Sequence, residues 1–258
     1  MKRIVFFSVI TLVLMGCGGG SGSHEDTNQK VSPDANANLS LTQHTDNNQG
    51  SDTQTTSGAS KESADTANST STASNPYPTP FMSEEKRSVL LNAINTARAE
   101  GQDCGKIDSN GIPVKDSKGH YIYDGSNIMA PATALKWSDA LYAAAYEHSD
   151  DLAQSDTASH SGSGTAFDWT GMDMGGRKST FVDRAKNSGY QFINLGENIS
   201  MGTHRDSIEK AVNSWLKSPG HCVNLMNPVY TEVGVGHVEK EGTTYRNYWT
   251  QVLGTPQR

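Results

Sequence analysis

Apolar residues recur at three- and four-residue intervals in four segments of the chain, a spacing typical of amphipathic helices. These segments are residues 83–101, 138–155, 179–190 and 206–220. Ser83 is the expected N-terminal cap of the first segment. In the last segment Asp206 and Glu209 have the spacing of a capping box, and Pro219 with Gly220 is expected to end the helix.

Nearer the C-terminus the apolar period changes to two, which predicts β-strands at residues 231–238 and 245–254. Gly234 and Gly236 share one face of the first strand, and glycine at alternate strand positions is typical of a place where another backbone or a ligand approaches closely. Turn-forming residues dominate residues 106–134, which we expect to form a hairpin-like insertion. Helices followed by strands predict an α+β fold, with helices packed on a mostly antiparallel sheet.

The first seventeen residues have the layout of a secretory signal. Lys2 and Arg3 precede an apolar run from Ile4 to Met15, which is shorter than the roughly 20 residues that a membrane-spanning helix needs. The end of the run, "LMGC", resembles the lipobox of bacterial lipoproteins, and this resemblance implies cleavage before Cys17 and lipidation of Cys17. A plain signal peptide cut nearby is the alternative.

Both alternatives predict that the mature protein lies outside the cytoplasm. With lipid on Cys17 it would be a lipoprotein anchored to a membrane. The residue after Cys17 is Gly18 and not Asp, which favours the outer membrane or cell surface over the inner membrane. Residues 18–76 contain no aromatic residue and are rich in Ser, Thr, Asn and Gly, which predicts a disordered tether. Residues 77–258 then form a single folded domain.

Charge and cysteine content narrow the classes of partner and of chemistry. The chain has a formal net charge of −7 and no cluster of basic residues, which argues against nucleic acid as a partner. With Cys17 assigned to the lipid, Cys104 and Cys222 are an even pair in an oxidising compartment, so a disulfide between them is expected. The chain contains no Gly-x-Ser-x-Gly motif of a serine hydrolase.

Several ordered motifs between about Ser83 and Gly254 resemble the bacterial branch of the CAP superfamily, which includes cysteine-rich secretory proteins, antigen 5 and pathogenesis-related 1 proteins. The motifs are "LKWSDAL", "SHSG", "GENIS", "SWLKSPGHCVNLMNP", "TEVGVG" and "YWTQVLG". The resemblance implies a three-layer α-β-α sandwich with a central cleft.

The resemblance also implies a cleft constellation of two histidines and acidic residues. Residue by residue, it assigns His160 in "SHSG", Glu197 in "GENI" and His221 in "PGHC". The second glutamate of the family pattern falls near Ser218, so this chain departs from the full set. Glu232 is a weaker candidate for the missing carboxylate.

Two histidines and a carboxylate can hold a divalent cation such as zinc or calcium, with an open position for water. The alternative is a hydrogen-bonded cluster of His160, Glu197 and His221 that orders the cleft without a metal. His148 lies on the apolar stripe of its helix with Leu141 and Ala145, which favours a buried structural histidine.

The preferred hypothesis is therefore a lipid-anchored, non-enzymatic binding or interaction module. Its cleft ligand, implied by the family, would be a lipid, a sterol, an ion or a protein. The alternative is a protease or other hydrolase, with or without zinc, in which water activated at His160, Glu197 and His221 attacks a carbonyl.

Overall fold

The computed structural model describes residues 78–257; the predicted signal sequence with Cys17 and the predicted tether lie outside this range. The helices are α1 (Glu84–Ala99), α2 (Asp139–Ser155), α3 (Trp169–Asp173), α4 (Phe181–Asn187), α5 (Ile208–Leu216) and α6 (Pro219–Met226). The strands are β1 (Gln102–Asp103), β2 (Ile128–Met129), β3 (Lys136–Trp137), β4 (Phe192–Met201), β5 (Glu232–Glu239) and β6 (Asn247–Pro256). Among these described residues, no helix has both the length and the apolar character needed to cross a membrane.

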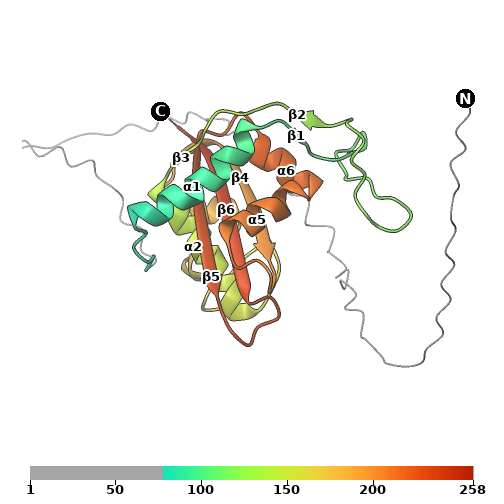
Figure 1. Cartoon of the computed structure of the whole chain (residues 1–258). Coiled ribbons are helices and arrows are strands. Elements are labelled where there is room, and N and C mark those ends of the chain that lie inside the picture. The colour runs from blue at the N-terminus through green and yellow to red at the C-terminus, as the bar shows by residue number, and fades with distance from the viewer. Residues whose placement is uncertain (1–77, 258) are drawn as a thin grey trace, which may run out of the picture. The chain divides into compact units, whose positions relative to one another are not determined.

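The main sheet has the strand order β3-β5-β6-β4, so β4 forms one edge (Figure 1). Strands β5 and β4 both pair antiparallel with β6, and only the short β3 pairs parallel, with β5. The sheet is therefore mostly antiparallel, as the sequence predicts.

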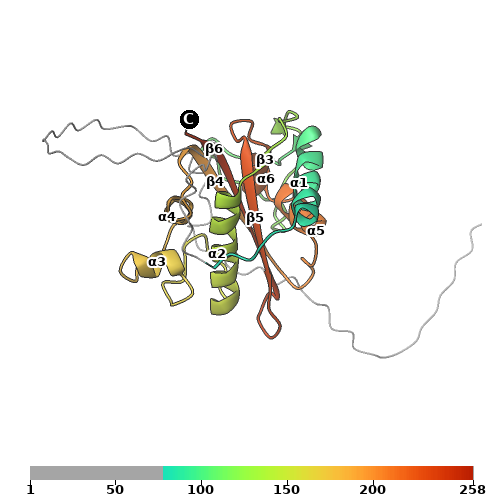
Figure 2. The ribbon, with the colours of Figure 1, turned by 90° about the vertical axis from the view of Figure 1, so that its left-hand side faces the viewer.

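Helices cover both faces of this sheet (Figure 2). One face packs against α1 and α5 through a core that includes Ile94, Trp215 and Val233. The other face packs against α2 and α4 through a second core that includes Leu141 and Val252. These layers form the expected three-layer α-β-α sandwich.

The two glycines of β5 allow α2 to lie directly on the sheet. A Cβ atom at Gly234 would lie 2.0 Å from the backbone nitrogen of Tyr142, and one at Gly236 would lie 2.5 Å from the carbonyl carbon of Ala145. Side chains at these positions would push the helix away from the sheet. The close approach of another backbone, predicted from the alternating glycines, is confirmed.

Local signals predicted some helix boundaries correctly and others wrongly. Ser83 accepts a hydrogen bond from the backbone N–H of Lys86 and caps α1 as expected. The cap of α5, however, is Ser207 and not Asp206. Pro219 does not end a helix but begins α6, because proline fits the first helical turn, where its missing N–H costs nothing.

The insertion has a hairpin-like neck but not a simple hairpin beyond it. Strands β1 and β2 pair antiparallel at the neck. Beyond the neck, three residues spaced eight apart bond in a cycle: Lys106 N–H donates to Ile122 O, Ile122 N–H to Val114 O, and Val114 N–H to Lys106 O. These segments thus form a small closed unit held by backbone hydrogen bonds.

Candidate functional site

The structure brings His160, Glu197 and His221 together at the edge strand β4. Glu197 pairs with Val252 in the sheet, and Val252 pairs with Gly234, so the Glu197 side chain is on the face covered by α2. His160 lies in the loop between α2 and α3, and His221 lies on α6. The three residues thus come from a loop, a strand and a helix that lie far apart in the sequence.

Of the three side chains, two are joined by a hydrogen bond and the third lies opposite them. His160 Nδ1 lies 2.9 Å from Glu197 Oε1, a hydrogen bond between a partly exposed ring and a buried carboxylate. The rings of His160 and His221 have their centres 6.3 Å apart. The site is therefore a bonded His160–Glu197 pair with His221 facing it.

Two buried residues beside Glu197 complete the site, and sequence reasoning did not assign them to it. The Arg184 guanidinium on α4 donates a 2.7 Å hydrogen bond from Nη2 to Glu197 Oε2. His148 Nε2 on α2 lies 3.8 Å from Glu197 Oε1 and 2.9 Å from the Ser159 carbonyl oxygen. Arg184 lies on the same face of α4 as the buried apolar residue Phe181. A charged residue on the apolar face of a helix is the sequence signal that could have pointed to Arg184.

These contacts set the charges of the site. Burial alone would raise the pKa of Glu197, but Arg184 and then the neighbouring histidines outweigh it and hold that pKa well below the usual range. Burial, with a smaller contribution from His160, lowers the pKa of His221 to about 4. Burial and then the positive charge of Arg184 lower the pKa of His148 to about 3. At neutral pH Glu197 is ionised, and His148 and His221 are uncharged.

Acidic residues of α2 hold the loop that carries His160. Glu147 accepts hydrogen bonds from the Thr170 backbone N–H (2.6 Å) and hydroxyl (2.9 Å). One turn later, Asp151 accepts a 2.8 Å hydrogen bond from the Ser163 backbone N–H. Both carboxylates are buried. The chain that follows His160 is thereby fixed to the same helix that supplies His148.

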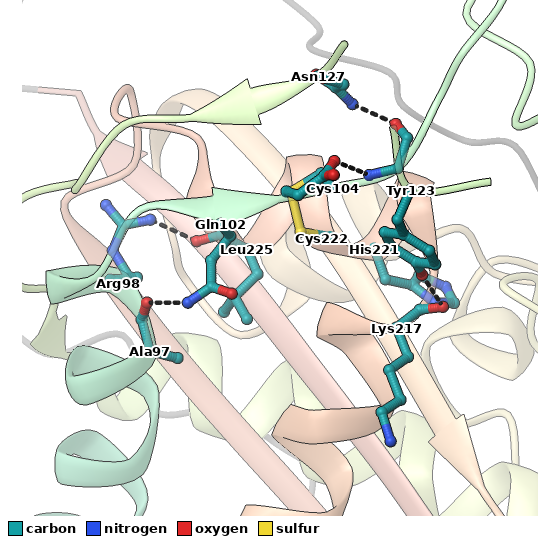
Figure 3. The surroundings of a disulfide bond; sticks show 12 residues. Ala97, Arg98, Gln102, Cys104, Tyr123, Asn127, Lys217, His221, Cys222 and Leu225 are labelled. Atoms are coloured by element: carbon teal, nitrogen blue, oxygen red, sulfur yellow. Dashed lines mark hydrogen bonds between the residues drawn. A yellow bond between two sulfur atoms is a disulfide. The ribbon is translucent and has the colours of Figure 1, made fainter. Parts of the chain in front are cut away.

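The predicted disulfide fixes the other half of the site. Cys104 and Cys222 are bonded, with their Cα atoms 5.3 Å apart and both side chains fully buried (Figure 3). Cys222 directly follows His221 on α6, so the bond joins that helix to the neck of the insertion. The Tyr123 hydroxyl adds a 2.6 Å hydrogen bond to the Lys217 carbonyl oxygen, just before α6.

Buried amides tie α6 to the edge strand. Asn224 on α6 donates to the Glu197 backbone carbonyl at 3.1 Å. In the opposite direction, Asn198 on β4 donates to the His221 carbonyl at 3.2 Å. The backbones that carry Glu197 and His221 are thus held in register with each other.

The structure does not bring Glu232 into this group. Glu232 lies in β5, where its backbone pairs with Gly254. Its carboxylate lies near the Tyr190 hydroxyl instead. Burial and, after it, this carboxylate raise the pKa of the Tyr190 hydroxyl. Ser218, where the family pattern places a second glutamate, precedes α6 and makes no side-chain capping bond.

The arrangement does not fit a three-ligand metal site, one of the two alternatives that the sequence left open. Both Glu197 oxygens are engaged, one by His160 and the other by Arg184, and a divalent cation at this carboxylate would lie beside the guanidinium. The two imidazoles that remain are fewer than the three protein ligands typical of catalytic zinc. Within residues 78–257, no group of three or more His, Cys, Asp or Glu side chains is arranged to hold a metal.

Comparison with known proteins gives two curated relatives in Bacillus subtilis strain 168. The chain is 38% identical over 69 residues to the uncharacterized protein YkwD, covering 27% of this chain and 24% of YkwD. It is 29% identical over 117 residues to the uncharacterized membrane protein YlbC, covering 45% of this chain and 28% of YlbC. The chain thus matches about a quarter of the length of each relative.

Among solved structures, an extracellular protein containing an SCP domain from Bacillus anthracis strain Ames is 27% identical, with a TM-score of 0.37, covering 48% of this chain and 34% of that chain. An outer surface protein from Borrelia burgdorferi is 21% identical, with a TM-score of 0.36, covering 49% of this chain and 80% of that chain. Residues 91–253 match the family described as CAP, the cysteine-rich secretory protein family. This match covers more than half of the chain and includes His160, Glu197 and His221, and the chain therefore belongs to the CAP family.

Proposed function

We propose that this protein is an extracytoplasmic binding module, anchored to a membrane by lipid on Cys17, that holds an amphipathic lipid. A cavity of about 620 Å³ carries the proposal. Its volume falls within the roughly 300–1,000 Å³ range of small-molecule sites. The family resemblance, which implies lipids and sterols among the ligands, supports the same class.

The cavity lies between the start of α1, the start of α5, helix α2 and strands β5 and β6. Its wall includes the aromatic side chains of Phe81, Tyr142, Tyr146 and Trp249, with aliphatic side chains such as Val89 between them. Such a surface releases water readily and favours the apolar body of a lipid over a polar metabolite. None of His160, Glu197 and His221 lines it.

The chemistry of Glu197 argues for binding over catalysis. A carboxylate whose two oxygens are bonded to His160 and Arg184, and whose pKa lies far below neutral, is a weak proton acceptor at pH 7. Cys104 and Cys222 are joined to each other and offer no thiolate.

One observation favours a hydrolase as the second candidate. The hydrogen bond that Glu197 accepts from His160 Nδ1 resembles the acid–histidine pair that orients a general base. Hydrolysis of an ester or peptide by the purified chain, lost in His160→Ala, would support this candidate. Rates equal to those of buffer would exclude it for the substrates tested.

We expect Val89→Trp to weaken lipid binding at least about tenfold, or roughly 1.4 kcal/mol. Val89 is 51% exposed and lines the cavity, so an indole there can fill the space without disturbing the core. Displacement of a fluorescent fatty acid from the purified full chain measures the effect. Val229→Trp, at a position that is 42% exposed and outside the cavity, is the matched control. Equal affinity of wild type and Val89→Trp would contradict the proposal.

We expect Cys17→Ala to abolish metabolic labelling by a palmitate analogue and to move the protein out of the membrane fraction. The reason is that the lipobox resemblance assigns the acyl chains to this cysteine alone. Ser21→Ala, a substitution of similar size nearby, should keep the label. Label that persists in Cys17→Ala would show that the anchor is wrongly assigned.

A further inference from the structure

Four large apolar side chains are exposed on and beside the short helix α3. Phe167 is 46% exposed, Trp169 36%, Met172 48% and Met174 43%. Trp169 and Met172 are three residues apart on α3, so they lie on the same side of the helix. Figure 2 shows α3 at the outer edge of the domain. We call these four residues the α3 patch; an exposed apolar cluster of this kind is typical of an interaction surface.

The polarity of this segment is the reverse of that in an ordinary surface loop. Asp168 and Thr170, which alternate with the first apolar residues, are each only 1% exposed. The Asp168 carboxylate accepts hydrogen bonds from the backbone N–H groups of Gly164, Gly171 and Ser179 at 2.9–3.0 Å. Thr170 donates to a buried carboxylate of α2. The polar side chains thus fix the segment to the domain, and the apolar ones are left facing solvent.

Basic residues lie next to the α3 patch. Arg177 and Lys178 follow Met174 closely in the chain, and Lys186 is on α4, whose last residue is hydrogen-bonded to α3. Arg177 is paired with Asp183 at 3.0 Å, but Lys178 and Lys186 are exposed and form no salt bridge with any residue between 78 and 257. The whole chain has a net charge of −7. A negatively charged surface can therefore approach this side of an otherwise acidic protein.

We propose that the α3 patch docks the domain on a phospholipid bilayer with anionic headgroups. Trp and Phe side chains are favoured at the boundary between headgroups and acyl chains, and Lys side chains are attracted to anionic headgroups. Phe167 and Trp169 enter this boundary, while Lys178 and Lys186 lie among the headgroup phosphates. The surface is distinct from the lipid cavity, which no residue of the α3 patch lines.

The chain that precedes the domain favours a bilayer over a protein as the partner. The proposed lipid on Cys17 would attach the chain to a bilayer, and a flexible tether as long as residues 18–76 has a root-mean-square span of roughly 40–45 Å. The domain would then meet the bilayer at a high effective concentration, at which even a weak patch binds. This step rests on the proposed anchor, whereas the affinity of the patch for anionic lipid does not, and the two are measured separately.

The test uses the full chain and vesicles of phosphatidylcholine and phosphatidylglycerol that carry bromine on their acyl chains. Bromine quenches tryptophan fluorescence only at short range, so a docked Trp169 should be quenched. Of the other tryptophans, Trp215 and Trp249 are buried and Trp137 is partly buried, so they should be quenched little. We expect quenching that largely disappears in Trp169→Phe, which keeps an aromatic ring in the patch. Absence of quenching in the wild type would overturn the proposal.

Met172→Asp should abolish docking, because it places a charge in the α3 patch at a position exposed enough to leave the fold intact. Val229→Asp makes the same change of charge outside the patch, at a position that is 42% exposed, and should keep the quenching. Lys178→Gln should lower the ratio of docked to undocked chains about fivefold. Equal quenching in wild type and Met172→Asp, or with and without phosphatidylglycerol, would refute docking of this patch on anionic lipid.

Flotation of the same vesicles separates docking from anchoring. A chain that floats with the vesicles but shows no quenching of Trp169 is anchored and not docked, which refutes the docking alone. A chain that carries no lipid and yet shows quenching of Trp169 with excess vesicles supports the docking and refutes the anchor. Crosslinking on the vesicles tests the other occupant: a dimer that Met172→Asp prevents, without quenching of Trp169, would assign the α3 patch to a second copy of the chain.

Discussion

Replacing Gly234 with alanine is expected to destabilise the protein by on the order of 4 kcal/mol, the range in which single substitutions become exceptional. The added methyl carbon would lie 2.0 Å from the Tyr142 nitrogen and 2.1 Å from the Leu141 carbonyl carbon. Both are backbone atoms of α2, so no side chain can rotate aside; the helix must shift from the sheet. Such overpacking ordinarily costs about 1–3 kcal/mol, and a rigid backbone neighbour places this case above that range.

Urea unfolding of the full chain, followed by far-ultraviolet circular dichroism, measures this loss. Gly101→Ala is the matched control, because a Cβ there would meet its nearest atom at an ordinary 3.4 Å. We expect the control to unfold at nearly the wild-type urea concentration. If Gly234→Ala unfolded there as well, α2 could not lie as close to β5 as the structure places it.

The same glycines show why part of the fold could be predicted from the sequence. Alternating glycines in a period-two strand and apolar residues in a period of three to four are local signals, and local signals predicted β5, β6 and four of the helices. Strand β4 was missed because its buried positions are not simply apolar. Glu197 and Asn198 are buried there only because Arg184, Asn224 and other distant residues bond them.

For the candidate site, too, contacts between residues far apart in the sequence could not be predicted. The family resemblance assigned His160, Glu197 and His221, and the fold brings them together. The charge that decides their chemistry comes from Arg184, which lies on a different element from Glu197 and contacts it through the fold. No spacing rule in the sequence links these residues. The choice between a metal site and a metal-free hydrogen-bonded cluster therefore depends on the structure, in which both Glu197 oxygens are engaged.

Acidification from pH 7 to pH 5 is expected to destabilise the folded domain by about 4 kcal/mol, at about 1.4 kcal/mol per pKa unit. Folding lowers the pKa of His148 from 6.5 to about 3 and that of His221 from 6.5 to about 4. Below pH 6.5 these two histidines therefore bind protons in the unfolded chain but not in the folded chain. The free energy of unfolding consequently decreases as the pH is lowered. Glu197 acts in the same direction at lower pH, because its depressed pKa contributes stability that is lost as the carboxylate is protonated.

Calorimetric melting at a series of pH values measures this effect as a drop in Tm of roughly 8–16 °C between pH 7 and pH 5, at about 2–4 °C per kcal/mol for a domain of this size. His148→Gln keeps a donor for the Ser159 carbonyl but cannot titrate, so it should remove about half of the pH dependence. His204→Gln, at an exposed position, should leave it unchanged. His148 and His221 lie on different helices beside the Glu197 cluster. Equal slopes in wild type and His148→Gln would therefore mean that His148 is not held neutral in the fold.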